Sequence, residues 1–165
     1  MSRVVIGLDP HKRSATIEVL DSNEQQLTAG RFGTDSESYQ RLLAAGRQFP
    51  RRIWAVEGCQ GVGRHLAQRL VADGETVVDV PAKLSARARV FSTGQGRKTD
   101  ATDAHSIAVV ALRTRSLRQV RADDQTVALR LLADRRDELG AARTLTLNRL
   151  HRLLVELCPV ARRRP

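Results

Sequence analysis

The order of strand-like and helix-like segments constrains this chain more than any other feature of its sequence. Three strand-like runs come first, and helix-like and strand-like segments then alternate. The predicted strands of the first group are 3–9 (RVVIGLD), 14–21 (SATIEVLD) and 26–33 (QLTAGRFG). Polar and apolar residues alternate in the second run, which predicts that only one of its faces is buried. Three strands followed by βα units predict a mixed α/β sheet flanked by helices.

The segments that follow continue this pattern as far as Arg113. Asp35 or Ser36 provides a capping signal for a helix, and Gly74 provides a stop signal for another. The predicted helices are 35–49, 61–74, 82–91 and 99–113, and the predicted strands are 51–57 and 75–80. This order of elements is the one found in the ribonuclease H-like fold.

After Arg115 the composition and the residue pattern of the sequence change. Residues 116–125 (SLRQVRADDQ) resemble a connector, and the chain from Asp124 to Leu157 predicts a long helix rich in Leu, Ala and Arg. Leu132 and Leu139 are one heptad apart, although polar residues interrupt the seam. Two interpretations stay open: a helical hairpin or dimerising coil, and a single helix that packs on its own domain.

Charge points to a polyanionic partner. The 165 residues contain 28 Lys and Arg against 18 Asp and Glu, for a net charge of +10. Such a balance favours nucleic acid, because each phosphate contact releases counterions; the alternative is a GC-rich genome that favours arginine codons. Cys59 and Cys158 have neither the number nor the spacing of a disulfide framework or a metal-binding finger. With no signal-peptide layout and no apolar run of membrane length, we expect a cytoplasmic protein.

Four acidic residues stand out by position. Asp9 ends the first predicted strand, Glu57 ends the fourth, and Asp100 and Asp103 lie three apart at the start of a helix. If the two strands are neighbours, these side chains can converge at one edge of the sheet, where Mg²⁺ (or Mn²⁺) would balance their charge. Each acid also has an ordinary explanation as a helix cap, a turn residue or a strand end.

Basic residues flank these acids. Lys12, Arg97 and Lys98 are predicted to contact backbone phosphates, with solvated surface charge as the alternative. His11 is expected to shape the turn after Asp9, the alternative being a phosphate contact. His105 is expected on the surface of its helix, the alternative being an approach to the metal.

Three stretches carry a family resemblance. They are VVIGLDPHKRSATIEVLD, WAVEGCQGVGRHLAQRL and VPAKLSARARVFSTGQGRKTDATDAHSIA. The chain resembles the DEDD transposases of the IS110 class of insertion sequences, whose N-terminal domain is similar to RuvC-like Holliday-junction nucleases. The likeness extends from Arg3 through Leu154 and is most specific in GRKTDATDAHSIA.

The resemblance implies a function and a domain division. It places the family's catalytic, metal-binding tetrad on Asp9, Glu57, Asp100 and Asp103. It implies a RuvC-like domain over residues 1–115, a coiled-coil segment over 116–165 that pairs protomers into a homo-oligomer, and metal-dependent cleavage and rejoining of DNA. It also implies a guide RNA, encoded by the element, that pairs with donor and target DNA.

One departure from the family concerns a serine nucleophile. The resemblance implies a further, serine-bearing domain, and no serine here lies in a matching motif, including Ser85, Ser92, Ser106 and Ser116. We therefore expect a truncated chain that is incomplete on its own. The alternative function is a non-catalytic module for DNA or RNA binding and dimerisation. An actin-like or sugar-kinase-like nucleotide binder is disfavoured, because GLDPHK lacks their glycine-rich phosphate hairpin.

Overall fold

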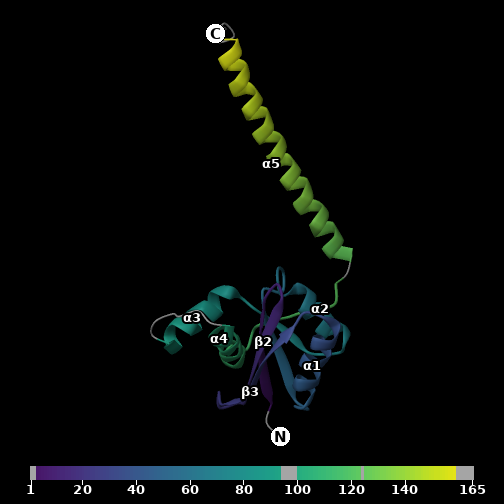
Figure 1. Ribbon diagram of the computed structural model, residues 1–165, viewed down its shortest axis with the longest axis vertical. Coiled ribbons are helices and arrows are strands. Elements are labelled where there is room, and N and C mark those ends of the chain that lie inside the picture. The colour runs from purple at the N-terminus through teal and green to yellow at the C-terminus, as the bar shows by residue number, and fades with distance from the viewer. Residues whose placement is uncertain (1–2, 94–99, 124, 159–165) are drawn as a thin grey trace. The chain divides into compact units, whose positions relative to one another are not determined.

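The computed structural model describes residues 3–93, 100–123 and 125–158, except for the side chains of residues 92, 93, 100 and 126. The chain divides into two compact units, Met1–Ala122 and Asp123–Pro165. The first contains a sheet with four helices, and the second consists of a long helix in its described part (Figure 1).

The first unit is built on one mixed sheet of six strands in the order β3-β2-β1-β4-β5-β6. The strands are β1 (Val4–Pro10), β2 (Ser14–Leu20), β3 (Gln26–Gly33), β4 (Arg52–Glu57), β5 (Val77–Val80) and β6 (Arg118–Gln119). The first three form an antiparallel meander, and β4 and β5 lie parallel to β1. The predicted mixed α/β sheet is therefore confirmed.

The edge strand β6 was missed by the sequence analysis. Its two residues pair antiparallel with Val78 and Asp79 of β5, within the segment that we had interpreted as a connector. A strand of two exposed residues has no periodicity to detect, and only the neighbouring strand defines it.

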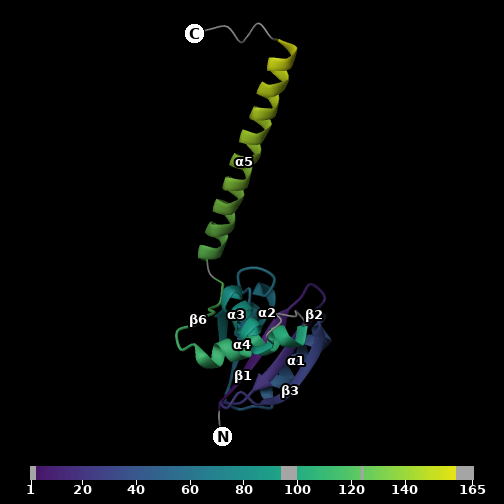
Figure 2. The ribbon, with the colours of Figure 1, turned by 90° about the vertical axis from the view of Figure 1, so that its left-hand side faces the viewer.

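Two helices cover each face of the sheet. They are α1 (Ser36–Arg47), α2 (Arg64–Ala72), α3 (Ala82–Thr93) and α4 (Asp100–Arg113). Helices α1 and α2 lie on one face and α3 and α4 on the other (Figures 1 and 2). Leucines of α1 and α2 pack with β1 and β4 in one core cluster, whereas Ile107 of α4 and Leu84 of α3 belong to a second cluster. The predicted cap of α1 is present, because the Asp35 carboxylate accepts a hydrogen bond of 2.8 Å from the Ser38 amide.

The expectation that β2 buries only one face is wrong. Ile17 and Val19 enter the core beneath α1 and α2, but Thr16, Glu18 and Leu20 are buried as well. The polar face of this strand is covered because α4, some ninety residues later in the sequence, packs against both β1 and β2. Local alternation therefore indicated the strand correctly but not the environment of its second face.

A glycine allows α4 to approach the centre of the sheet. Any Cβ on Gly7 of β1 would lie 2.2 Å from the carbonyl oxygen of Ala104 and 2.8 Å from the Cβ of Ala108. No side chain larger than hydrogen fits at that distance. Gly7 thus fixes how closely the first half of α4 lies on β1.

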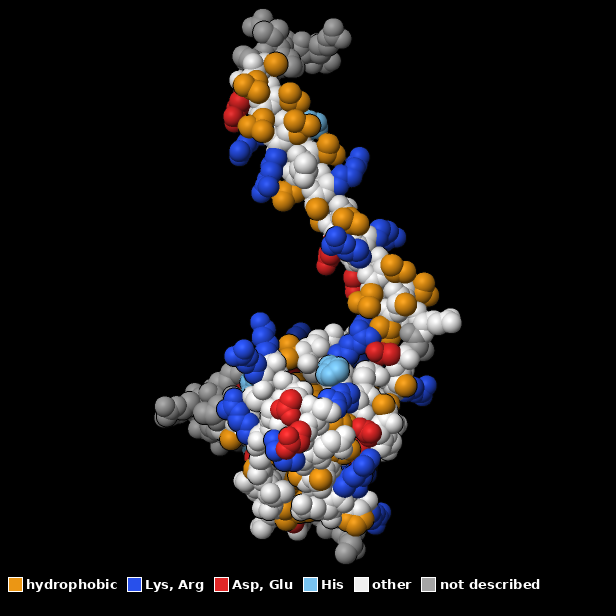
Figure 3. All heavy atoms as spheres, turned by 45° about the vertical axis from the view of Figure 1, so that its right-hand side comes forward, with side chains coloured by type: hydrophobic (Ala, Val, Ile, Leu, Met, Phe, Trp, Pro, Cys, Tyr) orange, Lys and Arg blue, Asp and Glu red, His pale blue; other side chains and the backbone are white. Residues whose placement is uncertain are grey.

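The second unit contains α5 (Gln125–Leu157), one continuous helix of 33 residues. Within the described residues 125–157 there is no break, so the hairpin interpretation is wrong for this stretch. Large apolar side chains are exposed along the helix, namely Leu129, Leu131, Leu132, Leu139, Leu145, Leu147, Leu150, Leu153, Leu154, Val155 and Leu157 (Figure 3). Among the helices that the structure describes, none combines the length and apolar character needed to cross a membrane.

Candidate functional site

Asp9 and Glu57 lie at the same edge of the sheet. Strands β1 and β4 are parallel neighbours, with Leu8 opposite Val56, so the next residue of each strand is one of these two acids. Side chains alternate along a strand, and Asp9 is two residues after Gly7, which faces α4. Asp9 is buried and Glu57 is half-buried. The first and fourth strands are thus neighbours, which was the condition for Asp9 and Glu57 to converge.

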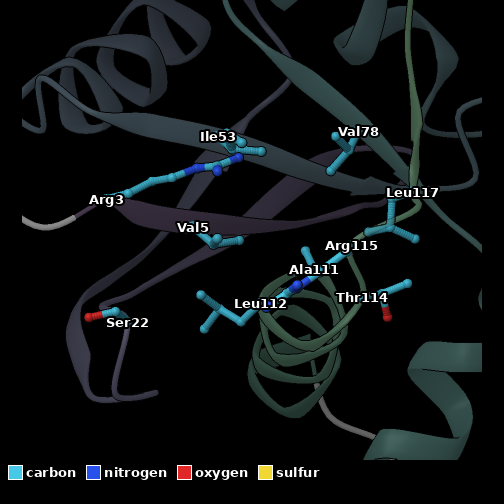
Figure 4. A pocket seen from close by; sticks show the side chains of 10 residues that line it. All are labelled: Arg3, Val5, Ser22, Ile53, Val78, Ala111, Leu112, Thr114, Arg115 and Leu117. Atoms are coloured by element: carbon cyan, nitrogen blue, oxygen red, sulfur yellow. The ribbon is translucent and has the colours of Figure 1, made fainter.

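Helix α4 brings Asp103 toward this edge. Ala104 lies directly over Gly7, so Asp103 is one residue from the contact between the helix and β1. Farther along the helix, Ala111 and Leu112 lie near Val5 and line a pocket at the start of β1 together with Arg3 (Figure 4). Helix α4 thus runs opposite to β1, and its first turn is at the carboxyl end of that strand. We call Asp9, Glu57 and Asp103 the carboxylate edge.

The other predicted site residues are less fully described. Asp100 is the first residue of α4, but its side chain lies outside the described part of the structure. Lys12 is exposed in the turn between β1 and β2, at the same edge. Arg97 and Lys98 lie outside the described residues.

Each acid of the carboxylate edge has a polar partner from the chain itself. Nε2 of His11 lies 2.9 Å from a carboxylate oxygen of Asp9. The Ser85 hydroxyl donates to the Glu57 carboxylate, and the Arg89 guanidinium forms an ion pair with Asp103. Ser85 and Arg89 are four residues apart on α3, so one face of that helix serves two of the three acids.

The donor atoms of this edge suit a hard divalent cation. Carboxylate oxygens are the ligands that Mg²⁺ prefers, and buried carboxylates require a positive partner. The hydroxyl of Thr16, opposite Asp9 in the strand pairing, is buried and has no hydrogen-bond partner among the described residues. In the present side-chain arrangement, no group of three or more His, Cys, Asp or Glu within the described part could hold a metal ion. The oxygen donors of this edge therefore suit a divalent cation, but Glu57 and Asp103 are bound to the side chains of Ser85 and Arg89.

Glu18 is a further buried acid that the sequence analysis missed. It lies on β2 opposite Gly7, is 5% exposed, and its carboxylate is 2.6 Å from Nδ1 of His105 on α4. His105 was expected on the helix surface, and it is instead half-buried against this acid. The available signal was the charge of Glu18 within a strand whose other residues are mostly apolar.

His11 has the expected role in the turn after Asp9. Its backbone amide donates a 2.8 Å hydrogen bond to the carbonyl oxygen of Ser14, which closes the turn between β1 and β2. Its side chain reaches back to Asp9 as well. The imidazole therefore contacts the carboxylate edge, a contact that the sequence analysis had not predicted.

Cys59, just beyond Glu57, is not a reactive thiol. Burial and the nearby carboxylate of Asp79 raise the pKa of Cys59 to about 12. Its sulfur also contacts the carbonyl oxygen of Val56 at 3.3 Å. Because the thiolate is the nucleophilic form of cysteine, this side chain is expected to be inert at neutral pH.

Comparison of the sequence with known proteins gives a matching family model and similar proteins from two insertion elements. A family model described as Transposase, of the DEDD and IS110 type, matches residues 6–159. The chain is 32% identical over 162 residues to the 44.8 kDa protein of insertion element IS116 from Streptomyces clavuligerus, which covers 98% of this chain and 40% of that protein. It is 32% identical over 142 residues to the 42 kDa protein of IS900 from Mycobacterium paratuberculosis, covering 84% and 35%. The chain thus spans 40% or less of these relatives.

Solved structures with a similar fold include RuvC of Thermus thermophilus. RuvC in complex with a Holliday junction substrate gives a TM-score of 0.55 at 20% identity, covering 72% of this chain and 99% of that one. A second structure of RuvC gives 0.52 at 18% identity, covering 71% and 99%. The predicted ribonuclease H-like, RuvC-like fold is confirmed.

Proposed function

Because this chain belongs to the IS110 class of DEDD transposases, we propose that its first unit is a metal-dependent DNA-cleaving domain. We assign catalysis and metal binding to Asp9, Glu57, Asp100 and Asp103. The observation that carries the assignment is the position of Asp9 and Glu57 at the ends of adjacent parallel strands, with the first turn of α4 packed beside them. Open α/β folds bind ligands at such an edge.

The acids and bases of this edge have separate roles in the proposal. A bound Mg²⁺ or Mn²⁺ would stabilise negative charge on the attacking and leaving oxygens of a phosphodiester. The carboxylates would hold the cation. The hydroxyl of Thr16, opposite Asp9 in the strand pairing, is able to donate to a water or a phosphate oxygen. Lys12, Arg97 and Lys98 contact backbone phosphates and fix the position of the strand without reading its sequence.

Partners follow from charge and from the family. The net charge of +10 favours a nucleic-acid partner, and Figure 3 shows scattered groups of Lys and Arg on the face in view. The family adds DNA as the substrate and a guide RNA encoded by the element. We assign catalysis to residues 1–115 and pairing of protomers to 116–165, where α5 exposes its leucines. Cleavage and rejoining of DNA are proposed as the activity of the whole-length protein, of whose relatives this chain spans 40% or less.

A second candidate function has its own support. Glu57 and Asp103 are engaged by Ser85 and Arg89, so the described side chains do not form a ready-made metal cluster. A module that binds DNA or RNA and dimerises, without cleaving, would be compatible with that arrangement.

Calorimetric titration with Mn²⁺ separates the two functions. We expect the wild-type chain to bind Mn²⁺ and Asp9→Asn to lose at least about tenfold in affinity, as is typical when the groups of a metal site are altered. Asp134→Asn is the matched control, because Asp134 is an exposed acid of α5. Absence of binding by the wild type would favour the non-catalytic module.

A further inference from the structure

Helix α3 presents two side chains to the carboxylate edge at a spacing of one turn. Ser85 is 2% exposed and contacts Glu57, and the side chain of Arg89 is 18% exposed and contacts Asp103. Helix α3 starts directly after β5, where the amide of Leu84 donates to the carbonyl of Pro81 at 2.8 Å. Leu84 and Ala88 pack into the core on the same side as α4. The position of the two polar residues is therefore set by the fold.

Arg89 supplies the charge that buried Asp103 requires. The side chain of Asp103 is 6% exposed, and a carboxylate so buried is strongly destabilising without a cationic partner. Within the described residues, the Arg89 guanidinium is the one cation that contacts it. A divalent cation bound to Asp103 would meet the same requirement, so the guanidinium and the cation are alternatives for the same carboxylate.

Ser85 can release Glu57 without losing a hydrogen bond. Its hydroxyl oxygen lies 3.1 Å from the carbonyl oxygen of Ala82, in addition to its contact with Glu57. A hydroxyl has one hydrogen to donate, and rotation transfers it from one acceptor to the other. Release of Glu57 therefore leaves no buried donor unpaired.

From these contacts, and resting on the proposed function, we propose that Arg89 is a placeholder for the metal ion. Arg89 neutralises Asp103 in the metal-free protein, and it turns to a DNA phosphate once metal and DNA are bound. A guanidinium suits both positions, because its planar fork pairs with carboxylate and with phosphate oxygens. Ser85 acts alongside it by holding Glu57 until the cation binds.

The first test measures the affinity of the 165-residue chain for Mn²⁺ by calorimetry. Loss of a charged competitor should make Arg89→Gln bind about tenfold tighter than the wild type, given the usual strength of hydrogen bonds to charged groups. Arg87→Gln is the control, because it removes the same charge from an exposed position of α3. Its affinity should equal that of the wild type.

A second variant and a second readout guard against a folding defect. Arg89→Lys keeps the charge but loses the fork, and it should bind Mn²⁺ with an affinity between those of the wild type and Arg89→Gln. In thermal unfolding, Arg89→Gln should have the lowest Tm without metal and gain most from saturating Mn²⁺. Equal or weaker Mn²⁺ binding by folded Arg89 variants overturns the placeholder role while the metal site stands. Absence of binding by both wild type and variants overturns the metal site as well.

A third test addresses the proposed contact between Arg89 and a DNA phosphate. In saturating Mg²⁺, DNA affinity measured over a salt series should give a slope smaller by about one for Arg89→Gln than for the wild type. An unchanged slope would overturn the transfer of Arg89 to DNA.

Discussion

Acids are buried in different ways at the two ends of the strands, that is, where β4 and β5 start and at the carboxylate edge. At the start of β4 and β5, Glu75 is held by Arg47 at 3.1 Å, by Arg52 at 2.6 Å and 2.7 Å, and by the Trp54 indole at 2.9 Å. At the opposite edge, Glu57 and Asp103 each have a single side-chain partner among the described residues. Glu75 is saturated by donors and has a structural role, whereas Glu57 and Asp103 keep acceptor capacity beyond their single side-chain partners. Partner number thus distinguishes a structural acid from one available to a cation.

The pKa of Glu75 is set by its hydrogen-bond donors as well as by its burial. Burial would raise the pKa of Glu75, but hydrogen bonds from Arg52, Trp54 and Arg47 outweigh it and hold the pKa below its ordinary value. The charged form is therefore the one that the fold stabilises.

The largest expected effect is on stability at Glu75. Glu75→Ala leaves Arg52 without its carboxylate and should lower the free energy of unfolding by about 3 kcal/mol, the range for removing one partner of a buried pair. Urea unfolding of the 165-residue chain measures it. A loss equal to that of Glu57→Ala would remove the distinction between the two edges.

Next in size is the effect of Gly7→Ala, which tests how closely α4 lies on β1. The added Cβ would meet the carbonyl oxygen of Ala104, so we expect a loss of about 1–3 kcal/mol in unfolding free energy and weaker Mn²⁺ binding. Gly140→Ala is the control, because its Cβ would meet no atom within 4 Å on α5. It should leave stability unchanged or raise it by up to about 1 kcal/mol. Unaltered Mn²⁺ binding in folded Gly7→Ala would contradict the position of α4 in the site.

Acid should weaken the Glu75 cluster through a defined pH range. A carboxyl with a lowered folded pKa contributes stability above its unfolded pKa of about 4.3, and this is lost as the pH falls through the folded value. The unfolding free energy of the wild type should therefore fall more steeply below about pH 5 than that of Glu75→Gln. Parallel pH profiles for the two proteins would contradict a lowered pKa at Glu75.

The smallest expected change in stability is at Glu57. Glu57→Gln keeps an acceptor for Ser85 and should alter the unfolding free energy by less than about 1 kcal/mol, yet reduce Mn²⁺ affinity at least about tenfold. Glu75→Gln should give the reverse, with lower stability and unchanged Mn²⁺ affinity. The pair is measured by urea unfolding and calorimetry, and equal Mn²⁺ losses in both would contradict the division of roles.

The sequence predicted the elements of the fold better than their contacts. Strand and helix signals are local, so the first strand, the capped helix at Asp35 and the stop at Gly74 could be read directly. The burial of Glu18 and the pairing of Asp103 with Arg89 depend on how α3 and α4 pack, which no local pattern encodes. The edge position of Asp9 and Glu57 was accessible, because parallel neighbours align their carboxyl ends.

Anomalous diffraction from crystals soaked in Mn²⁺ tests the central claim most directly. We predict a manganese peak within about 2.5 Å of carboxylate oxygens from Asp9, Glu57 and Asp103, with Arg89 displaced from Asp103. A well-diffracting soaked crystal with no peak at the carboxylate edge, and with the Arg89–Asp103 pair intact, would contradict it.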